Sequence, residues 1–198
     1  MNLARTSDND PIRVDFLPQN LLGMTGQLGM TMAPGKQHHG MHFLWERNLA
    51  QDLDQLRSHY KTNCLVSLIE QRELDDVKIP TLFSEAQARG MQTYWFPIPD
   101  MQVPVSVTEV VQVVKDILAL LQQGQVVVVH CMGGLGRTGV IVSCCLVALG
   151  HEPDAAIAKV RQTREYTVET QQQEEFVAEF SQAWTQDFNT QFVTLVTP

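Results

Sequence analysis

The sequence lacks any apolar run long enough to cross a membrane, and residues 1–16 lack the apolar core of a secretory signal. It also has no internal repeat and no low-complexity linker. Positive charge is scarce, since 14 Lys and Arg against 22 Asp and Glu give a formal net charge of −8. This balance argues against nucleic acid and anionic membranes as general partners. We therefore expect a soluble cytoplasmic protein; no oligomeric state follows from the sequence.

Cysteine is also scarce, and the spacing of the four cysteines fits neither a zinc site nor a disulfide framework. We expect Cys64, Cys144 and Cys145 to be buried free thiols, because they lie in apolar segments. An alternative is that Cys144 or Cys145 forms a protective disulfide with oxidised Cys131.

Three of the six histidines, His38, His39 and His42, are close together in the sequence. A metal site would need further ligands, and no cysteine or carboxylate lies nearby at ligand spacing. We expect these histidines to lie in a surface loop, with no metal bound.

The pattern of apolar residues predicts a single α/β domain. Residues 126–129 form a continuous β-branched run, typical of a central parallel strand covered on both faces. We therefore expect a mostly parallel sheet with helices on both faces. The predicted strands are 26–33, 62–69, 91–96 and 125–130, with a short one near 12–16. The predicted helices are 47–59, 81–89, 106–123, 138–149, 153–162 and 170–185.

The ends of the chain are expected to lie outside the main domain. We assign 1–19 to an N-terminal segment, 20–186 to the domain and 187–198 to a C-terminal tail. The tail has strong strand character, and the sequence does not decide whether it adds an edge strand, pairs with another copy or frays.

The most informative segment is residues 130–139, HCMGGLGRTG, which joins an expected strand to an expected helix. Its glycines allow a tight turn whose backbone N–H groups point at one anion, aided by the N-terminus of the helix. Arg137 adds a planar guanidinium that matches two phosphate oxygens. The segment predicts a phosphate-binding loop formed by Met132, Gly133, Gly134, Leu135, Gly136 and Arg137.

Three residues next to this loop carry its expected chemistry. Cys131 should be a thiolate nucleophile at neutral pH, because amides, a guanidinium and a helix N-terminus surround it. The hydroxyl of Thr138 is expected to bond the sulfur when the thiolate leaves. His130 is expected to fix the loop rather than to act as a base, since a preformed thiolate needs none.

Two other glycine-rich loops fit less well. A nucleotide P-loop requires Gly followed by Lys, whereas Gly136 is followed by Arg137, and Cys131 occupies the position of its first glycine. A dinucleotide motif matches Gly134, Gly136 and Gly139, but no acidic residue closes a second strand about twenty residues further on.

The HCMGGLGRT segment resembles the signature loop of the cysteine-dependent protein tyrosine and dual-specificity phosphatases. Within that superfamily the chain is similar to the kinase-associated phosphatase (cyclin-dependent kinase inhibitor 3-like) group. The similarity covers about residues 20–183 and includes the segments GQLGMTMAPGK, NCLVSLIEQREL and FPIPD. The resemblance implies hydrolysis of phosphotyrosine, with phosphoserine and phosphothreonine as further substrates, through a cysteinyl-phosphate and without a cofactor. It also implies a phosphoprotein partner and suggests a protein kinase.

Cleavage of a phosphoester also needs a proton donor for the leaving oxygen, and we assign this role to Asp100. Asp100 follows Pro97 and Pro99, which stiffen the loop after an expected strand. The resemblance implies the same role, although the motif here is Ile-Pro-Asp rather than Trp-Pro-Asp. The alternatives are that Asp100 only shapes a turn and that Asp75 or Asp76 is the acid.

The resemblance also implies that Gln173 positions the hydrolytic water, because it matches a glutamine in the family's last conserved segment. Glu169 stands where other tyrosine phosphatases carry a further glutamine. The alternative is a polar first helical turn with Thr170 as its N-cap.

Two other functions stay open at this point. One is a phosphatase of phosphoinositides or other small phosphomonoesters; phosphoinositide-directed members often carry lysines inside the loop, and its slots here are neutral. A catalytically silent phosphate-binding scaffold would gain little from retaining Cys131, Arg137, Thr138 and Asp100 together.

Overall fold

The computed structural model describes residues 4–40 and 42–196, with side chains as far as residue 187. A five-stranded sheet with the order β1-β2-β7-β5-β6 forms its centre. All neighbouring strands are parallel except β1, which pairs antiparallel with β2. The strands are β1 (Asp15–Phe16), β2 (Gln27–Thr31), β5 (Cys64–Ser67), β6 (Gln92–Trp95) and β7 (Val126–His130).

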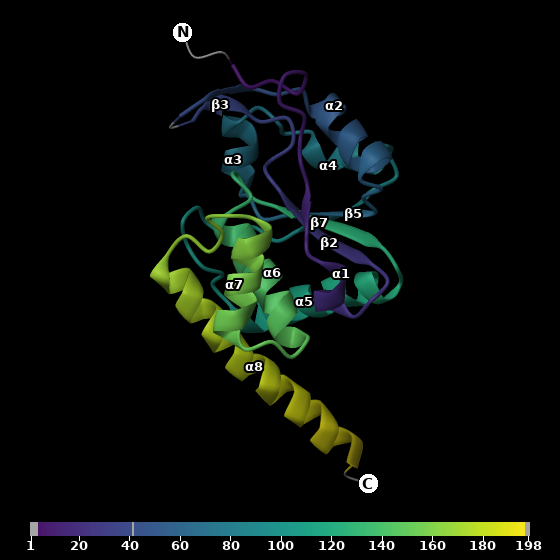
Figure 1. Cartoon of the computed structure of the whole chain (residues 1–198), viewed down its shortest axis with the longest axis vertical. Helices are drawn as coiled ribbons and strands as arrows, with labels where there is room; N and C mark the ends of the chain where they lie inside the picture. Colours follow the sequence, from purple (N-terminus) through teal and green to yellow (C-terminus); the bar gives the residue numbers. More distant parts are fainter. Residues whose placement is uncertain (1–3, 41, 197–198) are drawn as a thin grey trace.

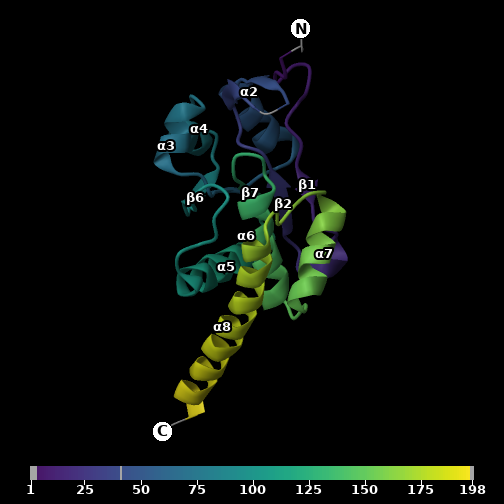
Figure 2. The ribbon, with the colours of Figure 1, turned by 90° about the vertical axis from the view of Figure 1, so that its left-hand side faces the viewer.

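Helices cover both faces of this sheet, as Figures 1 and 2 show. On one side lie α2 (Leu49–Asp54), the π-helical turn η1 (Gln55–His59), α3 (Gln71–Asp76) and α4 (Leu82–Ala88). On the other side lie α1 (Gln19–Leu22), α5 (Val107–Gln122), α6 (Gly136–Ala148), α7 (Pro153–Thr163) and α8 (Gln171–Val196). The predicted fold class, a mostly parallel α/β sheet with helices on both faces, is confirmed.

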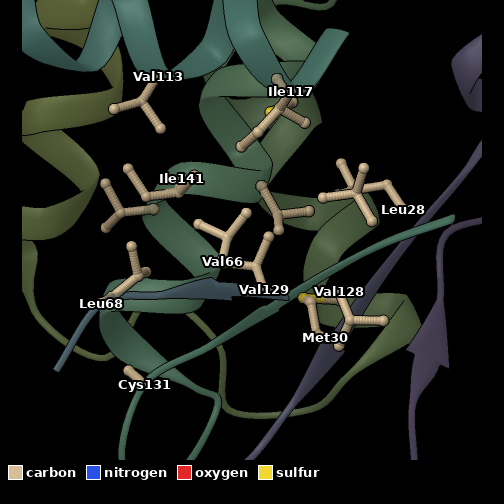
Figure 3. Close-up of a cluster of buried hydrophobic side chains, with 14 of the residues drawn as sticks. Leu28, Met30, Val66, Leu68, Val113, Ile117, Val128, Val129, Cys131 and Ile141 are labelled. Carbon is tan, nitrogen blue, oxygen red and sulfur yellow. The ribbon is translucent and has the colours of Figure 1, made fainter. Parts of the chain in front are cut away.

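Strand β7 lies in the middle of the sheet and is almost wholly buried. Val129 is paired in register with Met30 of β2 and Val66 of β5, so these side chains share one face. Figure 3 shows this row below Val113 and Ile117 of α5. Because β7 is pinned between two parallel neighbours, the position of the residue that follows it is fixed by the core.

Two elements form where the sequence predicted irregular chain. Residues 37–46 contain a hairpin of β3 (Gln37–His39) and β4 (Leu44–Glu46) instead of a loop. The polar connection after β5 contains α3, whose first turn has a reciprocal capping box between Glu70 and Glu73. Both elements are short, so their apolar periodicity is too brief to detect.

The strand character of the tail is not realised as a strand, because α8 continues to Val196. No glycine or proline occurs between Gln171 and Val196, so nothing in the sequence stops the helix once it has begun. At the other end of the chain, Ile12, Val14 and Leu17 are buried in the same core as the sheet. Within the described residues, no helix has the length and apolarity needed to span a bilayer.

Candidate active site

The predicted phosphate loop lies at the carboxyl end of β7, between His130 and the start of α6 at Gly136. Cys131 is 4% exposed and begins the loop. Figure 3 shows Cys131 at the edge of the apolar cluster, beyond Leu68. Open α/β sheets bind ligands outside the carboxyl ends of their strands, and the loop occupies this position.

The backbone amides of this loop are not used within the protein. From Met132 to Thr138, no N–H donates to another described residue; the first amide of α6 with an acceptor is that of Gly139, which bonds the carbonyl of Leu135 at 2.8 Å. Buried N–H groups are rarely left unpaired in proteins. A run of such donors around a helix N-terminus is therefore a site for an anion.

Gly134 is required by the shape of the loop. Its φ of +72° is unfavourable for other residues, and a Cβ there would lie 2.1 Å from the carbonyl oxygen of Thr31. The loop thus packs directly against the end of β2.

The guanidinium of Arg137 is held by three residues, one on α3 and two in the loop after β6. Its Nη1 and Nη2 donate to the two carboxylate oxygens of Glu73 on α3, at 2.7 and 2.8 Å. Nη1 also donates to the carbonyl of Ile98 at 2.9 Å, and Nη2 to Oδ1 of Asp100 at 2.8 Å. Its Nε–H donates to no described residue. Glu73 therefore binds the Nη1 and Nη2 atoms of the guanidinium. The other pair of donors, Nε and Nη2, lies on the side where Nη2 bonds Asp100.

Electrostatics keep Arg137 charged although its side chain is only 2% exposed. Burial alone would lower the pKa of Arg137. The hydrogen bonds that Arg137 donates to Glu73 and the negative charges of Cys131, Glu73 and Asp100 outweigh burial, so the pKa of Arg137 is raised instead.

His130 is fully buried, and its ring contacts the backbone carbonyl of Cys131 at the start of the loop. Burial lowers the pKa of His130 to about 4, so the ring is neutral at physiological pH. Its Nδ1 lies 3.1 Å from the carbonyl oxygen of Cys131, which can only accept, so Nδ1 carries the proton. This position fits the predicted role in fixing the loop.

Thr138 lies in the first turn of α6, and its Oγ1 is buried with no hydrogen-bond partner among the described residues. The hydroxyl is therefore available to another group. Its predicted bond to the Cys131 sulfur is absent from this structure and stays a prediction for the step in which the sulfur leaves.

The structure separates the three acid candidates. Asp100 reaches Arg137, and its side chain is 61% exposed, so solvent and substrate can reach it. Asp75 and Asp76 are exposed residues of α3, and the residue of that helix that contacts Arg137 is Glu73. Of these aspartates, only Asp100 lies against the predicted loop.

Gln173 is fully buried at the start of α8 and lies against Gly136, where a Cβ would come within 2.8 Å of its Nε2. Its Nε2 donates to the carbonyl of Gln102 at 3.4 Å, and its Oε1 accepts from the amide of Glu169 at 2.8 Å. Thr170 Oγ1 accepts from the Gln173 amide, so the N-cap interpretation also holds. Gln173 thus joins the Asp100 loop to the phosphate loop.

The remaining cysteines are buried free thiols, as predicted. Burial raises the pKa of Cys64 to about 11 and of Cys145 to about 12, and that of Cys144 lies well above its ordinary value. The histidines His38 and His39 lie in β3 rather than in a loop. Over residues 4–40 and 42–196, no group of three or more His, Cys, Asp or Glu is arranged to hold a metal.

Sequence reasoning assigned no role to three residues that touch the loop or its arginine. Glu73 pairs with Arg137, Lys36 bonds the carbonyl of Met132, and Arg164 bonds the carbonyls of Gly133 and Gly134. Glu70 and Glu73 have the spacing of a capping box, which could have revealed α3. Nothing in the local sequence signals Lys36 or Arg164, because their contacts are with distant residues.

Comparison with known proteins agrees with this geometry. Residues 39–151 match the family model described as "Tc-R-P: Polymorphic toxin system, DSP-PTPase phosphatase". Cyclin-dependent kinase inhibitor 3 of Rattus norvegicus is 26% identical over 176 residues, which cover 87% of this chain and 80% of that protein. Protein tyrosine phosphatase domain-containing protein 1 of Mus musculus is 41% identical over 105 residues, covering 52% of this chain and 13% of that protein.

The fold is shared with a crystal structure of kinase associated phosphatase in which serine replaces the catalytic-site cysteine. The TM-score is 0.80, with 23% identity over 88% of this chain and 96% of that one. The resemblance to the kinase-associated phosphatase group is thus confirmed in sequence and in fold. Because the family model spans more than half of the chain and contains the whole of residues 130–139, this protein belongs to the dual-specificity and protein tyrosine phosphatase family and is a phosphoric monoester hydrolase.

Proposed function

We propose that the protein hydrolyses phosphotyrosine in other proteins through a covalent cysteinyl-phosphate, with phosphoserine and phosphothreonine as further substrates. The observation that carries this proposal is the run of amides from Met132 to Thr138 that donate to no residue the structure describes, beside Cys131 and Arg137. An anionic nucleophile can approach a dianionic monoester only where fixed positive potential offsets the repulsion between them. The loop supplies that potential without blocking the line of attack.

In the first step, the Cys131 thiolate attacks phosphorus, and the S–P bond forms as the ester P–O bond breaks. Asp100 gives its proton to the leaving oxygen. The loop amides and the Nε–Nη2 edge of Arg137 stabilise the charge on the other three oxygens.

In the second step, water attacks phosphorus and the S–P bond breaks, releasing phosphate and the thiolate. Asp100, now a carboxylate, accepts the proton of that water. Gln173 orients the water, because it is buried between the Asp100 loop and Gly136. The unpaired hydroxyl of Thr138 donates to the departing sulfur, and His130 holds the Cys131 carbonyl.

The surroundings of the loop favour a peptide over a lipid headgroup with several phosphates. The side chains within the loop, between Cys131 and Arg137, carry no charge. Beside the start of α8 lies an open groove of about 660 Å³ lined by residues of both signs, among them Arg161, Glu165 and Glu169, together with the exposed Tyr166. A mixed groove suits the varied side chains that flank a phosphorylated residue.

The names of two relatives, cyclin-dependent kinase inhibitor 3 and kinase associated phosphatase, make a phosphorylated protein kinase the first protein substrate to test. We further propose that residues 20–186 are the catalytic domain and that α5 to α8 support its loop.

Phosphate release from a matched panel tests the proposal. One peptide sequence would carry phosphotyrosine, phosphoserine or phosphothreonine, and vesicles would carry a phosphoinositide, all in the presence of a chelator. We expect release from the phosphotyrosine peptide and none with Cys131→Ser. Preference for the lipid would replace the proposal with a phosphoinositide phosphatase. No release from any substrate would indicate a phosphate-binding scaffold.

A further inference from the structure

Two cations hold the phosphate loop from its outer side. Lys36 Nζ donates to the carbonyl of Met132 at 3.1 Å. Arg164 donates through Nη2 to the carbonyl of Gly133 at 2.9 Å and through Nε to that of Gly134 at 2.8 Å. Lys36, which directly precedes β3, and Arg164, which directly follows α7, thus bind three consecutive carbonyls of the loop.

These bonds set the direction of the amides. In a trans peptide the C=O and the following N–H point in opposite directions, and the described chain has no cis peptide. Carbonyls of Met132, Gly133 and Gly134 that are held outward therefore turn the N–H groups of Gly133, Gly134 and Leu135 inward. These are among the amides that donate to no described residue.

Lys36 is fixed in place by its surroundings. It is 4% exposed, and its Nζ lies 4.1 Å from the centre of the Trp45 ring. The preceding Gly35 has a φ of +74° and donates to Asp52, which forms a buried ion pair with Arg47 at 2.7 Å. Burying a lysine so completely is costly, and among the described residues the single hydrogen bond of Lys36 Nζ is to the loop.

Arg164 has the same arrangement on the other flank. Its side chain is 16% exposed, and its Nη1 pairs with Asp15 of β1, which lies beside α7 (Figure 2). The guanidinium thus anchors the loop to two separate elements. A lysine at this position would keep the charge but would lack the planar guanidinium that bonds two carbonyls and Asp15 through three separate nitrogens.

Both side chains also place positive charge behind the loop. Burial lowers the pKa of Lys36 to about 8; a negative charge on Cys131 and Asp52 opposes this, and Arg47 and Arg164 add to it. At neutral pH Lys36 is therefore mostly protonated, and its Nζ bonds the carbonyl of Met132, the residue next to Cys131.

We propose that Lys36 and Arg164 are positioning residues that hold the phosphate loop with its amides inward and so set its affinity for phosphate and the reactivity of Cys131. Neither residue touches the reacting atoms. The inference rests on the proposed function, since it concerns the same loop.

The test compares Lys36→Met and Arg164→Gln with Arg89→Gln. Arg89 is a matched control, because it is 21% exposed and bonds Asp54 and the carbonyl of Glu85 on α4, away from the loop. Protection of Cys131 from iodoacetamide by orthovanadate or by orthophosphate reports the anion site without relying on turnover. The pH dependence of alkylation reports the thiolate, and urea unfolding reports stability.

We expect Lys36→Met and Arg164→Gln each to weaken orthovanadate and orthophosphate binding about tenfold and to move Cys131 alkylation to higher pH. Arg89→Gln should change neither readout. Should Arg164→Gln fail to fold, Arg164→Lys, which keeps the charge, should show the same weakening.

Wild-type-like anion binding and alkylation in folded variants at both positions would overturn the inference and leave the proposed function intact. A wild-type protein whose Cys131 is neither alkylated selectively nor protected by orthophosphate would instead overturn the proposed function.

Discussion

Oδ1 of Asp100 accepts a hydrogen bond from Nη2 of Arg137 at 2.8 Å, although the Asp100 side chain is 61% exposed. Glu73 occupies the Nη1–Nη2 end of the same guanidinium. The remaining pair of donors, Nε and Nη2, is the one that can bond two phosphate oxygens. Asp100 already accepts a hydrogen bond from Nη2. An incoming ester must therefore share or displace this contact, which couples ester binding to the position of Asp100, the proposed acid.

Replacing Asp100 with alanine should have two opposite effects. Turnover of alkyl phosphates should fall about 10²–10⁴-fold, because a poor leaving group needs the proton, and aryl phosphates should lose less. Orthovanadate should bind more tightly, because a competing carboxylate is gone. Steady-state kinetics with both ester classes and inhibition by orthovanadate measure these effects.

Asp75→Ala is the control, since Asp75 is exposed and its carboxylate has one hydrogen-bond partner among the described residues, Gln71 at 3.4 Å. It should behave as wild type. Unchanged alkyl phosphate turnover in Asp100→Ala would place the general acid elsewhere.

Glu73→Ala should destabilise the protein strongly. It leaves the buried Arg137 without its bidentate partner and removes the capping box of α3. Loss of one partner from a buried ion pair costs about 3–5 kcal/mol. Urea unfolding should show this loss, and KM should rise as the guanidinium loses its orientation.

The matched variant is Glu85→Ala, which removes a partly exposed glutamate 3.5 Å from Arg89. It should change the free energy of unfolding by less than about 1 kcal/mol. A similarly small effect of Glu73→Ala would contradict the structural role given to the Glu73–Arg137 pair.

His130 should make the protein sensitive to acid. Burial lowers its pKa from 6.5 to about 4, so between these values the unfolded chain binds a proton that the folded chain does not. Stability attributable to His130 is therefore present above pH 6.5 and is lost as the pH falls toward 4. The pKa difference corresponds to roughly 3 kcal/mol.

His130→Asn keeps a donor for the Cys131 carbonyl and removes the titration. Unfolding free energies of both proteins between pH 7 and pH 4 would isolate the histidine from the carboxylates that titrate in the same range. Parallel pH dependences in the two proteins would refute the burial of a neutral ring.

The loop could be predicted from the sequence because its residues are contiguous, and β7 because its β-branched run is continuous. The contacts that Glu73, Lys36 and Arg164 make with the loop and its arginine could not be predicted from the sequence. Glu73 is 64 residues from Arg137, Lys36 is 96 from Met132, and Arg164 is 30 from Gly134. Only the packing of strands and helices brings these charges together, and one sequence gives no measure of that packing.

The strand propensity of single residues was also a poor guide to the structure of the C-terminal tail. Residues 189–196 are rich in β-branched and aromatic side chains, yet the structure continues α8 through them. Strand propensity depends on a neighbouring strand to pair with, whereas a helix already formed extends one bond at a time.

The most direct test of the account is to trap the phosphoenzyme. The protein would be mixed with an aryl phosphate, quenched in acid within a turnover, digested and mapped by mass spectrometry. We predict a phosphate on Cys131, absent in Cys131→Ser. Turnover with no phosphate on Cys131, or with phosphate on another residue, would contradict the cysteinyl-phosphate mechanism.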